Sequence, residues 1–218
     1  MFKEIIATLL IVAVAVSNSL QIIQDTPTCG TCVSNLADSF SAIQNIVVTN
    51  TSVNSCQNLC PLLGDYYSAS CSLTCLAFGY TSFTNYIVYD TPDPIYVCQY
   101  AELCATNSNP TALITNFTTT PAYAPVGTDI QVTMQYTVTV GTGQSQIIIA
   151  GPSGNTFLQY ERLLHQISGK DTISFLLSTL GDVPGVYSIT GLVCAETCFS
   201  TAPGAATLSK SYYSYQLN

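Results

Sequence analysis

Ten cysteines constrain what this chain of 218 residues can fold into. Two of them form the short motif Cys29-Gly-Thr-Cys32, which stands at the head of a helical pattern. This spacing fits a redox pair, half of a zinc site, or one end each of two separate structural disulfide bonds. The motif alone does not choose between these three interpretations, so the choice depends on the rest of the chain.

The N-terminal segment predicts secretion. Lys3 stands in a short polar start, an apolar run covers residues 5–16, and small residues suited to cleavage follow. This is the pattern of a secretory signal peptide, here residues 1–19. The alternative, a membrane anchor, is disfavoured because the apolar run is too short to span a bilayer comfortably. We expect a secreted, extracellular or endolysosomal chain that is not an integral membrane protein.

A secreted chain with an even number of cysteines predicts a disulfide framework. Secretion disfavours the redox pair, and zinc is disfavoured because the only histidine, His165, lies far from the cysteine cluster. Two sequons, at Asn50 and Asn116, are the expected glycosylation sites, whereas the one at Asn109 is blocked by its proline.

The first half of the chain has a helical period. Apolar residues and cysteines recur every three or four positions from Cys29 to Val47, which predicts one face of a helix. The next two pairs of cysteines are each spaced by four residues, with Pro61 and Gly64 between the pairs to turn the chain. An antiparallel helical hairpin then nests its disulfide bonds, and the same nesting extends to the ends. The predicted pairs are Cys29–Cys104, Cys32–Cys98, Cys56–Cys75 and Cys60–Cys71.

This cysteine pattern resembles the six-cysteine frame of saposin B-type domains. The residues that carry the resemblance are Cys29, Cys32, Cys60, Cys71, Cys98 and Cys104, with "DPIYVCQYAELC" at 93–104. In that family the first cysteine pairs with the sixth, the second with the fifth and the third with the fourth, which gives the same nesting. Cys56 and Cys75 depart from the frame as an additional pair. The resemblance covers residues 25–108 and implies a helical shell that opens around lipid acyl chains.

The second half of the chain has the period of a β-sheet. In residues 128–140 apolar side chains alternate with Gln and Thr, which predicts a long half-buried strand. Further strands are predicted in "SQIIIA", "TISFLL", "GVYSITGLV" and "ATLSKSYYSYQL". Residues 109–218 are therefore expected to form an immunoglobulin-like antiparallel β-sandwich, with Tyr187 as a tyrosine corner. Cys194 and Cys198 are expected to close a small loop, and residues 105–125 suit a junction between the domains.

A saposin-like module followed by a β domain, in a secreted chain rich in Asn, Thr and Ser, resembles the countin-like proteins of social amoebae. Those proteins are secreted components of a factor that limits the size of cell aggregates during development. The resemblance implies a role in group size and cell adhesion, with other secreted or cell-surface proteins as partners.

Charge excludes two function classes. Between Asp25 and Cys104 there is no Lys or Arg. The same segment contains six carboxylates: Asp25, Asp38, Asp65, Asp90, Asp93 and Glu102. Nucleic-acid binding needs cations to neutralise phosphates, and cationic pore formation needs attraction to anionic membranes. Lipid remains a possible partner at acidic pH, because these carboxylates lose their charge near about pH 4. The apolar residues for that role are Leu36, Phe40, Ile43, Val47, Leu73, Phe78, Ile87 and Val88.

Motifs for catalysis are absent from the sequence. His165 lies in "YERLLHQISGKD", which lacks a nucleophile elbow, and every cysteine has a plausible disulfide partner. Glu161 and Asp171 could be imagined as paired carboxylates, but no spacing rule supports a general acid and base there. The sequence has no P-loop, dinucleotide fingerprint or metal-ligand cluster. We therefore predict a non-enzymatic protein without a cofactor.

Overall fold

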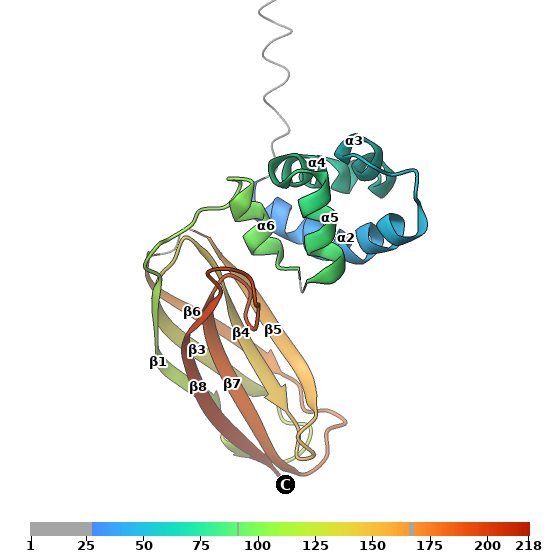
Figure 1. Cartoon of the computed structure of the whole chain (residues 1–218). Helices are drawn as coiled ribbons and strands as arrows, with labels where there is room; N and C mark the ends of the chain where they lie inside the picture. Colours follow the sequence, from blue (N-terminus) through green and yellow to red (C-terminus); the bar gives the residue numbers. More distant parts are fainter. Residues whose placement is uncertain (1–27, 91, 166–167) are drawn as a thin grey trace, which may run out of the picture.

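The computed structural model describes residues 28–90, 92–165 and 168–218. The predicted signal peptide, residues 1–19, lies outside the described residues. A helical domain comes first in the chain and an elongated β domain follows it (Figure 1). The helical domain lies at one end of the β domain, and the C-terminus lies at the opposite end (Figure 1).

The helical domain is built around one long helix. Its elements are α2 (Cys29–Thr49), α3 (Cys56–Leu59), the 3-10 helix η2 (Cys60–Leu63), α4 (Asp65–Phe78), α5 (Tyr80–Tyr89) and α6 (Pro94–Tyr100). Thr28 caps α2, because its hydroxyl oxygen accepts a 3.3 Å hydrogen bond from the backbone N–H of Thr31. Gly64 and Gly79, at φ of 81° and 77°, separate η2, α4 and α5, since this backbone region suits glycine.

The predicted helical face of α2 is confirmed. Cys29, Cys32, Leu36, Phe40 and Ile43 are buried against the other helices. Two polar residues, Asn35 and Ser39, are buried on the same helix, which the apolar pattern did not predict. The side-chain amide of Asn35 donates to the carbonyl oxygen of Tyr66 at 3.0 Å and to the hydroxyl of Ser70 at 3.1 Å. These bonds tie α2 to α4 and satisfy the buried amide nitrogen.

Five disulfide bonds join the pairs that the sequence predicts. They are Cys29–Cys104, Cys32–Cys98, Cys56–Cys75, Cys60–Cys71 and Cys194–Cys198. The first bond joins α2 to the segment that follows α6, and the second joins α2 to α6. The third bond joins α3 to α4, and the fourth joins η2 to α4. The cysteines of the helical domain are part of its apolar core. The fifth bond lies in the β domain, where it closes a short loop.

The β domain consists of two sheets. Its strands are β1 (Thr111–Thr120), β2 (Tyr123–Ala124), β3 (Ile130–Thr139), β4 (Thr142–Ala150), β5 (Thr156–His165), β6 (Ser168–Leu177), β7 (Gly185–Ala195) and β8 (Ala206–Leu217). The strand order is β1-β3-β6 in one sheet and β2-β8-β7-β4-β5 in the other. Neighbouring strands are antiparallel except β2, which pairs parallel with β8.

One apolar core lies between the two sheets. The predicted alternation on β3 is confirmed, because Ile130, Val132 and Met134 are buried while the residues between them are exposed or half-buried. Tyr187 on β7 is buried, and its hydroxyl donates a 2.8 Å hydrogen bond to the carbonyl oxygen of Val183. This is the backbone contact expected of a tyrosine corner.

The connection between the domains is shorter than the sequence indicates. We interpret residues 105–125 as a junction, but β1 and β2 occupy most of that segment. Phe117 and Thr119 face the core of the β domain and are buried. The surrounding Thr and Asn residues hide this alternation, because β1 is an edge strand with many polar side chains. Strand β5, also at a sheet edge, was not predicted either.

Candidate functional site

The two predicted glycosylation sites lie on the surface, one in each domain. Asn50 is exposed at the C-terminal end of α2, and Asn116 is exposed on β1. Within the described part of the chain, no group of three or more His, Cys, Asp or Glu side chains could hold a metal ion. No helix of that part combines the length and apolar character needed to cross a membrane.

The apolar residues expected to contact lipid lie mostly in the closed core of the helical domain. Leu36, Phe40, Ile43 and Ile87 are buried. The others, Val47, Leu73, Phe78 and Val88, are half-buried. A groove of about 320 Å³ between α2 and α5 is lined partly by Val47, Val48, Val88 and Tyr89. Val48 and Tyr89, which are both exposed, therefore offer an apolar surface at that groove.

Glu161 and Asp171 are engaged by different partners rather than arranged as an acid and a base. The side-chain amides of Gln144 and Gln146 each donate a 2.8 Å hydrogen bond to Glu161. Asp171 accepts a 3.0 Å hydrogen bond from the hydroxyl of Tyr136 and forms an ion pair of 3.4 Å with Arg162. Both carboxylates therefore link neighbouring strands.

Asp93 connects the two domains. Only 2% of its surface is exposed, although it carries a carboxylate. It caps α6, because Oδ1 accepts hydrogen bonds from the backbone N–H groups of Ile95 at 2.8 Å and Tyr96 at 3.3 Å. From the β domain, Thr197 donates its hydroxyl to Oδ1 at 2.7 Å and its backbone N–H to Oδ2 at 3.2 Å. The burial of this carboxylate is therefore compensated by four hydrogen bonds.

Glu196 is a second buried carboxylate at this junction. It is 6% exposed, and its Oε2 has no hydrogen-bond partner among the described residues. Burial, and to a smaller degree the Asp93 carboxylate, raises the pKa of Glu196 from 4.5 to about 7. Gly204 leaves room for this side chain, since a Cβ atom there would lie 2.8 Å from Oε1. The junction therefore suits a protonated Glu196 better than an ionised one.

The loop between β7 and β8 also reaches the helical domain. A cavity of about 360 Å³ has Phe78, Tyr86 and Tyr96 on one side and the loop residues 201–203 on the other. Further contacts come from Gln99, whose amide donates to the carbonyl oxygen of Thr142 at 3.5 Å. The junction thus combines polar bonds with an aromatic surface.

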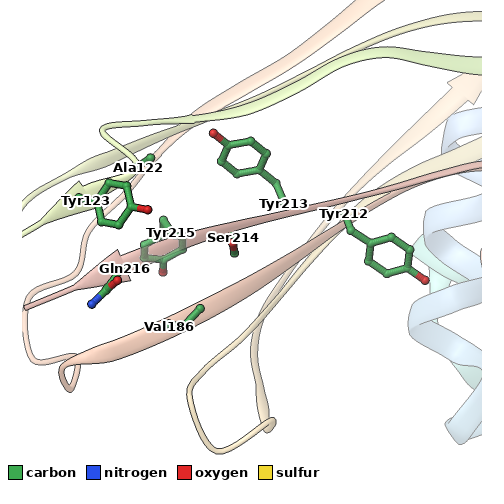
Figure 2. Close-up of a pocket in the computed structure, with 8 residues that line it drawn as sticks. All are labelled: Ala122, Tyr123, Val186, Tyr212, Tyr213, Ser214, Tyr215 and Gln216. Atoms are coloured by element: carbon green, nitrogen blue, oxygen red, sulfur yellow. The ribbon is translucent and has the colours of Figure 1, made fainter.

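A separate candidate site is a groove of about 610 Å³ along β8 and its neighbours β2 and β7 (Figure 2). It is lined by Ala122, Tyr123, Val186, Tyr212, Tyr213, Ser214, Tyr215 and Gln216. We call it the tyrosine groove. Tyr123 and Tyr212 are 72% and 67% exposed, so their rings are accessible to a ligand.

Strand pairing arranges the lining of the tyrosine groove. Tyr123 stands opposite Gln216, and Gln216 stands opposite Val186, so these three exposed residues form a row across β2, β8 and β7. Tyr212 lies on the same face of β8 as Gln216, because side chains alternate along a strand. Figure 2 shows Tyr212 and Tyr213 leaving β8 on opposite sides.

Neither site was predicted from the sequence, although Asp93 and the tyrosines of the groove each left a signal. Asp93 precedes Pro94, and an Asp followed by Pro at the first helical position is a helix-start signal. The repeated tyrosines of "SYYSYQ" suggested a strand, but not which rings face outward. Glu196 gave no usable signal, because its burial depends on contacts between segments that are far apart in the sequence.

The fold and these sites define a class: a disulfide-stabilised two-domain protein, with a helical domain followed by a β domain. Family comparisons agree with this division. The Countin N-terminal domain matches residues 21–102, and the Countin C-terminal domain matches residues 112–218. The chain therefore belongs to the countin family.

Three countins of Dictyostelium discoideum are similar to this chain along most of its length. Countin-1 is 29% identical over 218 residues, which cover 96% of this chain and 84% of Countin-1. Countin-3 is 24% identical over 223 residues, covering 99% of each chain. Countin-2 is 25% identical over 209 residues, covering 91% of this chain and 80% of Countin-2.

Similarity to solved structures is slight. A cycloisomaltooligosaccharide glucanotransferase of Paenibacillus sp. is 14% identical, with a TM-score of 0.38, over 50% of this chain and 14% of that chain. At this level of similarity, no ligand or activity transfers from that enzyme to this chain.

Proposed function

We propose that this chain is a secreted, non-enzymatic countin-type factor that regulates group size and cell adhesion during development. The observation that carries the proposal is the match of both halves, in order, to the two countin domains. The five disulfide bonds support an oxidising, extracellular location, since such bonds persist outside the cytosol. Its partners in this role are other secreted or cell-surface proteins.

Two finer assignments of fold accompany this proposal. The helical domain is taken as saposin B-type, which the nested disulfide pairs support. The β domain is taken as an immunoglobulin-like sandwich, which the two sheets, the parallel pairing of β2 with β8 and the hydrogen bond of Tyr187 support.

The hydrogen bonds of the acidic residues support a non-enzymatic role. Glu161, Asp171 and Asp93 bind neighbouring strands or domains, rather than facing one another across a cavity. All ten cysteines are in disulfide bonds, so none is available as a nucleophile.

The experiment is a group-size assay on developing social amoebae. Purified chain, secreted with its disulfide bonds intact, is added to starving Dictyostelium discoideum cells, and the number and size of groups are counted. The proposal expects a dose-dependent change in group size. The control is the same chain after reduction and alkylation, which lacks the disulfide framework. Equal effects of both forms, or no effect of the native chain at any dose, would contradict the proposal.

Lipid binding at acidic pH is a second candidate function. The observation that favours it is the exposed apolar pair Val48 and Tyr89 at the groove between α2 and α5. Transfer of such side chains into a lipid interface is favourable by roughly 1–3 kcal/mol each. The carboxylates of the helical domain repel anionic lipid at neutral pH, so this function is proposed for acidic conditions only.

Vesicle flotation with the full chain tests this second function. Binding to phosphatidylserine-containing vesicles is expected near about pH 4.5 and absent near about pH 7. The variant Val48→Asp should abolish it, whereas the matched control Leu62→Asp, at an exposed leucine on η2, should not. Equal binding at both pH values, or equal loss in both variants, would remove lipid binding from consideration.

A further inference from the structure

We propose that the tyrosine groove is a binding site for a neutral oligosaccharide. This proposal is independent of the group-size role. Oligosaccharide binding can be measured on the purified chain, so the two proposals can fail separately. The groove is elongated, it exposes two aromatic rings, and the residues that line it are uncharged.

The volume of the groove, about 610 Å³, lies within the range of about 300–1,000 Å³ found for small-molecule sites. Tyr123 lies beside Gln216, and Tyr212 lies four positions earlier on β8. At about 3.3 Å per residue, this places the two exposed tyrosines roughly 13 Å apart along the strand. Between them lies Ser214, a small residue that leaves the space open. Two exposed aromatic rings with a small residue between them suit an elongated ligand that contains several sugar rings.

The aromatic residues of the groove are held in place. Tyr215 lies beneath it, 2% exposed, and stacks on Tyr187 with ring centroids 5.0 Å apart. The ammonium group of Lys210 lies 5.0 Å from the centre of the Tyr212 ring, a cation–π contact that restrains the ring. A restrained ring loses less conformational entropy when a ligand stacks on it.

The lining offers both surfaces that a sugar ring requires. The faces of Tyr123 and Tyr212 are apolar and can pack against the C–H face of a pyranose. Their hydroxyl groups, the hydroxyl of Ser214 and the amide of Gln216 can donate and accept hydrogen bonds with sugar hydroxyls.

The composition of the groove disfavours other ligands. None of the described residues that line it is charged, and Lys210, which contacts the Tyr212 ring, adds a single positive charge beside it. A nucleic acid or anionic polysaccharide requires several cations to neutralise its charges. An acyl chain would leave the hydroxyl and amide groups of the lining without partners. A neutral, polyhydroxylated ligand satisfies both the aromatic and the polar groups.

The test is a titration of the purified chain with three uncharged probes: maltopentaose, cellopentaose and chitopentaose. A heparin oligosaccharide is the charged comparison. Tyrosine fluorescence reports directly, since the chain has 14 tyrosines and no tryptophan, and calorimetry gives the affinity. We expect at least one neutral probe to bind and heparin not to bind.

Matched tyrosine variants locate the binding. Tyr123→Ala and Tyr212→Ala should each weaken binding about tenfold or more, whereas Tyr123→Phe should keep most of it because the ring remains. Tyr66→Ala, at an exposed tyrosine on α4, is the control and should bind normally. Circular dichroism confirms that each variant is folded. Failure of all three neutral probes, binding of heparin alone, or full binding by the Tyr123→Ala/Tyr212→Ala double variant would overturn the proposal.

Discussion

The hydroxyl of Thr197 in the β domain donates a 2.7 Å hydrogen bond to Oδ1 of Asp93 in the helical domain. The same carboxylate oxygen accepts the backbone N–H of Ile95 and so fixes the start of α6. One buried side chain therefore couples the geometry of a helix terminus to the position of the loop after β7. Its loss would disturb a helix cap and a domain contact together.

The variant Thr197→Val isolates the domain contact. It removes the hydroxyl donor to Asp93 while leaving the helix cap intact. We expect it to lower the free energy of unfolding by roughly 1.5–3 kcal/mol, because hydrogen bonds to charged groups are stronger than neutral ones. Denaturant unfolding measures this loss. The control is Thr207→Val on the exposed face of β8, which should change stability by less than about 0.5 kcal/mol. Equal losses in both variants would contradict this role of Thr197.

Glu196 predicts a stability that falls as pH rises. The pKa of its carboxyl group is about 7 in the folded chain, against an ordinary value of 4.5, so the folded state binds the proton more tightly. Its contribution is complete below about pH 4.5 and is lost progressively as pH rises to about 7. The loss is at most about 3 kcal/mol. Asp93 is the neighbouring carboxylate that adds to the effect.

The test compares unfolding of the native chain and Glu196→Gln between about pH 5 and pH 8. The amide is neutral throughout, so the variant should lose less stability across this range than the native chain does. The difference between the two curves isolates the contribution of Glu196 from that of the other titrating groups. Parallel curves would show that Glu196 is ionised in the folded state across the whole range.

The disulfide framework predicts a specific peptide map. Digestion without reduction should yield the pairs 29–104, 32–98, 56–75, 60–71 and 194–198. Replacing Cys56 and Cys75 together by Ser should lower the free energy of unfolding by about 3 kcal/mol, as expected for a loop of this length. A free thiol at either position in the native chain, or a bond between the two domains, would contradict the nested arrangement.

Glycosylation is predicted at two positions. Asn50 and Asn116 are exposed and lie in sequons, so a secreted chain should carry a glycan at each. Mass spectrometry of Asn50→Gln and Asn116→Gln should show the loss of one glycan per variant. Asn109→Gln is the matched control and should change nothing, because its sequon contains proline. A double variant of Asn50 and Asn116 that still carries an N-glycan would refute this assignment.

The sequence predicted the helices and strands in which apolar residues recur at regular intervals, and the disulfide bonds whose cysteines are regularly spaced. The face of α2 and the alternation of β3 follow from single-segment periodicity, and the cysteine spacing constrained the nested disulfide bonds. Strand β1 was hidden because threonine and asparagine mask its alternation. The role of Asp93 depends on Thr197, which lies in the other domain, and the burial of Glu196 depends on the path of the loop that contains Gly204. The tyrosine groove likewise requires the pairing of β2 with β8, which no local pattern specifies.

The stacked pair Tyr187 and Tyr215 provides a prediction with a built-in control. Their rings lie 5.0 Å apart and nearly parallel, but their hydroxyl groups differ. The hydroxyl of Tyr187 donates to the carbonyl oxygen of Val183 at 2.8 Å, whereas that of Tyr215 is buried without a hydrogen-bond partner among the described residues. Removing the first hydroxyl therefore breaks a bond, and removing the second relieves an unsatisfied polar group.

We expect Tyr187→Phe to lower the free energy of unfolding by about 1 kcal/mol. Tyr215→Phe should leave it unchanged or raise it, because the ring contact is kept and a buried unsatisfied donor is lost. Both substitutions preserve the apolar core, so denaturant midpoints can be compared directly at a constant m-value. A larger loss in Tyr215→Phe than in Tyr187→Phe would mean that the Tyr215 hydroxyl has a partner, and that the corner bond of Tyr187 contributes little to the β domain.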